Sequence, residues 1–139
     1  MKTTWLVDAD GTIWYENPIK YALKDVATLL SNCSGFGREE LFKILLNEQV
    51  NRLRKRQCLK AYDWEDIVLS ISMRVCKDER IAKEALKTLQ ETLSKRVRET
   101  KLLEGVLEAF SRAKEEDISI VIVSNGLSKY RRNVVEALP

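Results

Sequence analysis

The chain has 139 residues, 45% of them hydrophobic, which is enough for the core of about one domain. It contains no histidine, and this excludes the usual Ser–His and Cys–His nucleophile pairs and argues against a zinc site. The net charge is only +3. No run of about 18 apolar residues occurs, so the sequence does not indicate a membrane-spanning protein.

The three cysteines, Cys33, Cys58 and Cys76, are an odd number and form no Cys-x-x-Cys pair. This pattern predicts free thiols that pack as small apolar side chains in a reducing compartment. The N-terminus shows no signal-peptide pattern, because charged and polar residues interrupt it by position 8. These features together predict a cytoplasmic protein.

The first predicted element is a buried strand at residues 5–7, which are apolar and favour strands. It ends abruptly in two carboxylates, Asp8 and Asp10, followed by Gly11. Carboxylates held a few ångströms apart repel each other unless a cation or a shared proton intervenes, so this stretch predicts a Mg²⁺ site with oxygen ligands. The alternative is a strand that ends in an ordinary Asp-Gly turn, a pair of residues that is common in hairpins.

Between residues 17 and 100, apolar residues recur at the spacing of amphipathic helices. Pro18 is suited to the first turn of a helix, and Asp63 and Asp78 are suited to the N-cap positions of two further helices. Four helices with short connections are therefore predicted, and such an arrangement suggests a bundle. They cover about residues 18–32, about 38–60, a segment after Asp63, and Asp78 to about residue 98.

Two clusters of basic residues are interpreted as solvated helix faces. The first comprises Arg52, Arg54, Lys55 and Arg56 with Lys60 nearby, and the second comprises Lys129, Arg131 and Arg132. No nucleic-acid recognition motif accompanies either cluster, so no nucleic-acid partner is predicted.

A second strand is predicted at residues 118–123, which contain four consecutive β-branched residues. Such a run suits a central parallel strand that is covered on both faces. It ends in Ser124, Asn125 and Gly126, and the polar ends of the two strands are expected to form one site at the edge of a parallel sheet. Helices are predicted on either side of this strand, at residues 105–116 and 128–138.

The two strand ends together resemble the motifs of the haloacid dehalogenase superfamily, and specifically its phosphatase-like members. The first motif of that family is an apolar strand followed by Asp-x-Asp-x-Thr, which Asp8, Asp10 and Thr12 match. The second motif is an apolar strand that ends in Ser or Thr, which Ser124 matches within Ser-Asn-Gly.

The resemblance implies an α/β fold in two parts. Residues 1–16 and 101–139 would form a Rossmann-like parallel-sheet core, and residues 17–100 would form an inserted α-helical bundle that acts as a cap. The lysine and the acidic pair of the third and fourth family motifs are absent before Pro139, so the core would be incomplete. A homodimer or a complementing C-terminal polypeptide is expected to supply the missing strands, because long apolar edges are rarely left unpaired.

The activity implied by the resemblance is Mg²⁺-dependent hydrolysis of a small phosphorylated metabolite through an aspartyl-phosphate. Asp8 would be the nucleophile, and Asp10 would be the general acid and base that Thr12 orients. Both acids would hold the metal, Asp8 by its side chain and Asp10 by its backbone carbonyl. The residues implied in substrate and phosphate binding are Thr12, Ser124, Asn125 and Gly126.

Other functions are left open by the sequence. A catalytically inactive binding or regulatory module would keep Mg²⁺ or phosphate binding without turnover. A phosphomutase or a dehalogenase-type member of the same superfamily is a further alternative, although Asp10 favours phosphate esters because carbon–halogen cleavage needs no acid for a leaving oxygen. The last alternative is a purely helical interaction module formed by residues 17–100.

Overall fold

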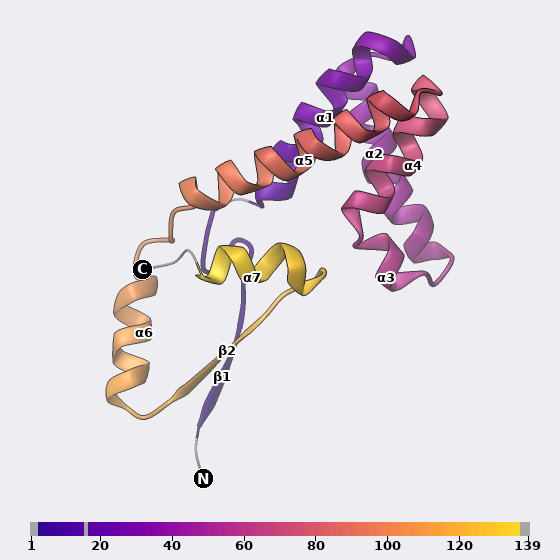
Figure 1. Cartoon of the computed structure of the whole chain (residues 1–139). Coiled ribbons are helices and arrows are strands. Elements are labelled where there is room, and N and C mark those ends of the chain that lie inside the picture. The colour runs from indigo at the N-terminus through magenta and orange to yellow at the C-terminus, as the bar shows by residue number, and fades with distance from the viewer. Residues whose placement is uncertain (1–2, 16, 137–139) are drawn as a thin grey trace. The chain divides into compact units, whose positions relative to one another are not determined.

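The computed structural model (Figure 1) describes residues 3–15 and 17–136 and divides into two compact units. Unit 1 comprises Met1–Asn17 and Arg98–Pro139, and unit 2 comprises Pro18–Val97. Unit 1 is therefore formed from both ends of the chain, with unit 2 inserted between them in the sequence. None of the helices in the described residues is both long enough and apolar enough to cross a membrane.

Unit 2 is built from helices whose apolar stripes pack together. In chain order they are α1 (Pro18–Ser34), α2 (Arg38–Arg54), α3 (Cys58–Ala61), α4 (Trp64–Cys76) and α5 (Glu79–Glu99), the last extending two residues beyond the unit. Helices α1, α2 and α4 contact one another, and α3 contacts α2 and α4. The large side chains buried in this core include Leu23, Val26, Leu30, Leu41, Leu45, Ile67, Val68, Ile71 and Leu89.

The helix starts follow the predicted caps. Asp63 Oδ1 accepts a hydrogen bond from the backbone N–H of Asp66 at 3.4 Å, and Asp78 Oδ1 accepts one from the N–H of Arg80 at 2.8 Å. The predicted helix over residues 38–60 ends early, at Arg54. Arg56 has a left-handed backbone with a φ of 59°, which a helix cannot contain, so the chain turns before α3 begins.

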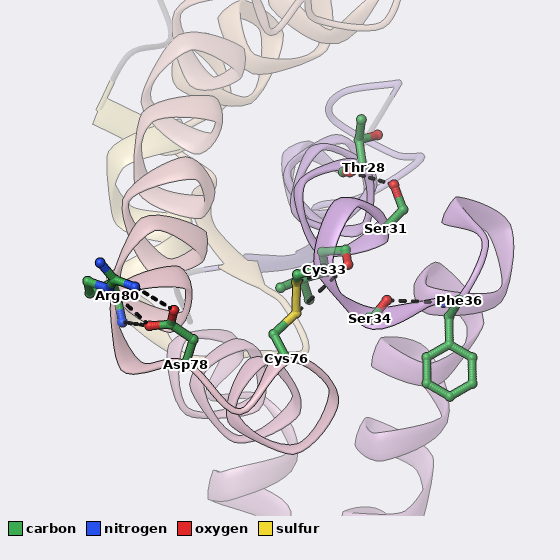
Figure 2. Close-up of a disulfide and its surroundings, with 9 residues drawn as sticks. Thr28, Ser31, Cys33, Ser34, Phe36, Cys76, Asp78 and Arg80 are labelled. Atoms are coloured by element: carbon green, nitrogen blue, oxygen red, sulfur yellow. Dashed lines mark hydrogen bonds and ion pairs between the residues drawn. A yellow bond between two sulfur atoms is a disulfide. The ribbon is translucent and has the colours of Figure 1, made fainter.

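Two of the three cysteines form a disulfide, so the prediction of three free, packed thiols is wrong. Cys33 at the end of α1 is bonded to Cys76 at the end of α4, and their Cα atoms are 5.4 Å apart (Figure 2). Cys58 is free, but it is exposed and not packed in the core. The pairing depends on the packing of α1 against α4, which the spacing of the cysteines in the sequence does not reveal.

The interpretation of Arg52 as part of a solvated basic helix face is also wrong, because this residue is buried. Its Nε donates to Glu48 Oε1 at 2.9 Å, and its Nη1 donates to Asp66 Oδ2 at 2.6 Å and to the carbonyl oxygen of Lys60 at 2.9 Å. Burial by itself lowers the pKa of Arg52, but the hydrogen bonds to the two carboxylates raise it above its ordinary value. The charged guanidinium therefore connects α2 to the end of α3 and to α4.

We expect Arg52→Met to lower the free energy of unfolding by about 2 kcal/mol, because three hydrogen bonds to a buried cation are lost. The cost is limited because the side chain of Asp66 is 57% exposed and can be solvated. Urea denaturation followed by circular dichroism measures this change. The matched control is Arg54→Met on the exposed face of the same helix, which should shift stability by no more than about 0.5 kcal/mol. Equal effects of the two variants would contradict a structural role for Arg52.

The described residues of unit 1 form a small sheet and two helices. Strand β1 (Thr4–Asp8) pairs in parallel with β2 (Ser119–Val123), and the register runs from Thr4 opposite Ser119 to Asp8 opposite Val123. Helix α6 (Val106–Glu115) precedes β2 and contacts it, and α7 (Ser128–Glu136) follows. The last residues of the helix predicted to reach residue 138 lie outside the described residues.

The predicted α/β fold with a Rossmann-like parallel-sheet core is wrong for the described residues. Most of these residues are helical, and their sheet has only two strands. Only two stretches of the chain have the continuous apolar run of a strand, whereas the apolar residues elsewhere recur at helical spacing. The prediction that both strands are buried is also wrong, because much of β1 and β2 is exposed. The small sheet leaves apolar surface open, since Leu6 is 74% and Val123 is 51% exposed. The homodimer or second polypeptide expected to cover such surface stays a prediction.

Candidate functional site

The parallel register brings the carboxyl ends of β1 and β2 to the same edge of the sheet. Asp8 lies directly opposite Val123, the last residue of β2, so Ser124 directly follows the neighbouring strand. Asp8 is exposed and Ser124 is half-buried, and the Ser124 hydroxyl donates to the carbonyl oxygen of Asn125 at 3.3 Å. The chain also turns at Asp10 and Gly11, as the alternative interpretation expected, but the described residues form no hairpin there, because β1 pairs with β2.

A tight loop follows β1 and determines where the second acid lies. The carbonyl oxygen of buried Ala9 accepts a hydrogen bond from the N–H of Ile13 at 2.9 Å, and the N–H of Gly11 donates to the carbonyl oxygen of Trp14 at 2.8 Å. Gly11 has a φ of 76°, a left-handed conformation that glycine adopts without steric cost. The loop is attached to the segment before α6, where the N–H of Leu103 donates to the carbonyl oxygen of Ile13 at 2.9 Å.

Asp10 is held by the side chain of Trp14. The indole Nε1–H donates to Asp10 Oδ1 at 2.7 Å, and Trp14 itself is completely buried. The family resemblance implied that Thr12 orients Asp10, and Thr12 is exposed. The spacing of four residues between Asp10 and Trp14 was visible in the sequence, but only the tight turn at Gly11 brings the two side chains together.

A cavity of about 440 Å³ lies in unit 1 beside this edge of the sheet. Its walls come from the loop after β1, from the end of β2 and from α7, and the lining residues are Ala9, Trp14, Ile122, Ser124, Gly126, Arg132, Val135 and Glu136. Two predicted phosphate-binding residues, Ser124 and Gly126, belong to this lining, whereas Asp8, Asp10, Thr12 and Asn125 do not. Arg132 was interpreted as part of a solvated face, and it is exposed but lines the cavity.

The residues at the end of β1 are compatible with Mg²⁺, which prefers oxygen ligands. Asp8 is exposed and Asp10 is half-buried, so a cation there keeps access to water. The described residues contain no group of three or more His, Cys, Asp or Glu side chains that could hold a metal. A magnesium ion at this position would therefore rely on Asp8, Asp10, backbone carbonyls, water and substrate phosphate, a ligand set that Mg²⁺ commonly uses.

Comparison with known proteins yields little similarity. No family model matches the chain, and no curated protein matches it. Among solved structures, a crystal structure of a dehalogenase is similar with 17% sequence identity and a TM-score of 0.46. The similarity covers 99% of this chain and 57% of the dehalogenase chain, so the present chain spans little more than half the length of that protein.

Proposed function

We propose that this chain carries the phosphoryl-transfer residues of a Mg²⁺-dependent phosphoric-monoester hydrolase acting on a small phosphorylated metabolite. The observation that supports this proposal is the parallel register, in which Asp8 lies opposite Val123 and the polar ends of both strands emerge at one edge. Ligands of parallel sheets bind outside the carboxyl ends of the strands. The resemblance of both strand ends to the motifs of phosphatase-like haloacid dehalogenases supports the reaction class.

In the first step, an Asp8 carboxylate oxygen attacks phosphorus, and the bond between phosphorus and the ester oxygen breaks. Asp10 gives its proton to the departing oxygen, so the alcohol leaves neutral. The Asp8 carboxylate and the Asp10 backbone carbonyl would hold Mg²⁺, which would supply charge that offsets the repulsion between nucleophile and phosphate.

In the second step, water attacks phosphorus of the aspartyl-phosphate at Asp8, and Asp10 takes up the proton of this water. The bond between phosphorus and the Asp8 oxygen breaks, which releases inorganic phosphate and restores both acids. The Ser124 hydroxyl and the backbone N–H groups of Asn125 and Gly126 would donate hydrogen bonds to the phosphoryl oxygens in both steps.

Removal of the metal tests the proposal directly. We expect EDTA to lower the rate of p-nitrophenyl phosphate hydrolysis by about 10²–10³-fold, because one electrostatic partner of the transition state is lost. Mg²⁺ should restore the rate and Ca²⁺ should not, since Ca²⁺ prefers longer bonds and more ligands. Full activity after dialysis against EDTA would contradict a metal-dependent reaction.

The hydrogen bond from Trp14 to Asp10 gives a second expected result. Trp14→Phe keeps an aromatic ring in the loop but removes the indole N–H that donates to Asp10. We expect kcat to fall about 10-fold with little change in KM, because a hydrogen bond to a carboxylate contributes about 1.5–3 kcal/mol and Asp10 acts in the chemical step. The loss should be larger for phenyl phosphate than for p-nitrophenyl phosphate, since the poorer leaving group depends more on an acid.

Trp5→Phe is the matched control for this variant, because Trp5 lies on β1 but is 37% exposed and is not in the loop. Its kcat should equal that of the unmodified chain. If Trp14→Phe lowers the rates of both esters by the same factor, Trp14 does not act through the acid.

A further inference from the structure

We propose that the cavity of unit 1 is the subsite for the leaving group, and that it selects phosphate monoesters whose alcohol carries a compact, uncharged apolar body such as a benzyl group. The inference rests on the proposed function and names the substrate class for the same site. Three observations support the inference: the lining of the cavity, the position of the cavity at the end of β2, and the contacts of Trp14 with both the cavity and Asp10.

The lining of the cavity favours an apolar ligand. Ala9 and Trp14 are completely buried, and with Ile122 and Val135 they supply an aromatic and aliphatic wall. A volume of about 440 Å³ lies within the range of about 300–1,000 Å³ that is typical of small-molecule sites. The space is therefore suited to an apolar group of the size of an aromatic ring and unsuited to a macromolecule.

The polar groups of the cavity favour a phosphoryl group at its edge. Ile122 and Ser124 are two residues apart on an extended chain, so their side chains point to the same side and the apolar wall is continuous with the Ser124 hydroxyl. Arg132 from α7 adds a cation that attracts an anion. Glu136 also lines the cavity and offsets the charge of Arg132, so the alcohol part of the ester should be neutral.

Trp14 connects the cavity to the proposed general acid. Its side chain belongs to the lining, and its Nε1–H donates to Asp10 Oδ1 at 2.7 Å. The cavity and Asp10 therefore have Trp14 as a common neighbour.

The test compares benzyl phosphate with ethyl phosphate, because both esters have a primary alcohol as leaving group and differ in the apolar body. We expect kcat/KM for benzyl phosphate to exceed that for ethyl phosphate by about 10-fold or more. Val135→Trp fills the cavity and should reduce this ratio toward unity. The matched control is Val50→Trp on α2 of unit 2, where the valine is 40% exposed compared with 37% for Val135, and it should leave the ratio unchanged.

A binding measurement separates the subsite from the proposed reaction. Benzylphosphonate and ethylphosphonate have a carbon–phosphorus bond that ester hydrolysis does not cleave, and isothermal titration calorimetry with Mg²⁺ present gives their affinities. Tighter binding of benzylphosphonate that Val135→Trp abolishes would support the subsite even if no ester were hydrolysed, a result that would overturn only the hydrolase. Hydrolysis with equal kcat/KM for the two esters, or a preference that Val135→Trp leaves intact, would overturn the subsite and keep the hydrolase. Absence of both hydrolysis and binding would overturn both.

Discussion

Asp8→Asn is expected to lower kcat/KM for phosphate monoesters by roughly 10³–10⁶-fold, the range seen when a catalytic nucleophile or an equivalent residue is removed. The amide of asparagine is nearly isosteric with the carboxylate but cannot form the phosphoenzyme and carries no charge for Mg²⁺. Asp8 is exposed at the end of β1, so its replacement should leave the fold and the thermal midpoint unchanged. Steady-state hydrolysis of p-nitrophenyl phosphate, with circular dichroism of both proteins, measures the two effects.

Two further variants make the result specific. Asp8→Glu keeps the charge but moves the carboxylate by one methylene, and it should remain strongly impaired because the attack needs an oriented oxygen. Glu84→Gln on α5 removes an equal charge from an exposed position in unit 2, and it should keep full activity. Unchanged hydrolysis by Asp8→Asn would show that Asp8 is not the nucleophile.

Loss of the Cys33–Cys76 disulfide is expected to lower the free energy of unfolding by about 2–4 kcal/mol. The bond connects the ends of α1 and α4 across 43 residues, and a closed loop of that length restricts the unfolded chain strongly (Figure 2). Cys33→Ser should therefore shift the urea midpoint downward. Dithiothreitol should destabilise the unmodified chain by the same amount and leave Cys33→Ser unaffected.

Cys58→Ser is the matched control, because Cys58 is exposed and unpaired, and this variant should unfold at the same urea concentration as the unmodified chain. Mass spectrometry after alkylation without reductant provides an independent readout. One modified cysteine per chain is the expected result, whereas three would show that Cys33 and Cys76 are thiols in solution.

The helix boundaries show how much of the fold local sequence predicts. The caps at Asp63 and Asp78 and the start of α1 at Pro18 were predictable, because they depend on hydrogen bonds and dihedral angles within a few residues. The break before α3 was not predictable, because Arg56 adopts a left-handed conformation that cannot be inferred from its residue type. The two strands were predicted as well, but the Rossmann-like core expected from the family resemblance is not formed, because the sheet of the described residues has only two strands.

The candidate site, too, was predictable from the sequence only in part. The positions of Asp8 and Ser124 at two strand ends followed from apolar runs that stop at polar residues, and the parallel register then aligned those ends. No sequence pattern predicted that Trp14 donates a hydrogen bond to Asp10 or that Arg132 lines the cavity. An indole four residues after an acid has many possible partners, and a basic residue on a helix is usually solvated.

The sequence by itself determined the helical segments, their caps, the two strands and the polar residues at the strand ends. Periodicity and capping act over fewer than about ten residues, so they can be recognised without knowledge of the fold. Only the tertiary structure decided that Arg52 is buried between Glu48 and Asp66, that Cys33 meets Cys76, and that Trp14 reaches both Asp10 and the cavity. Each of these contacts depends on how separate segments pack or turn, and a side chain has no preferred partner until packing or a turn brings one within reach.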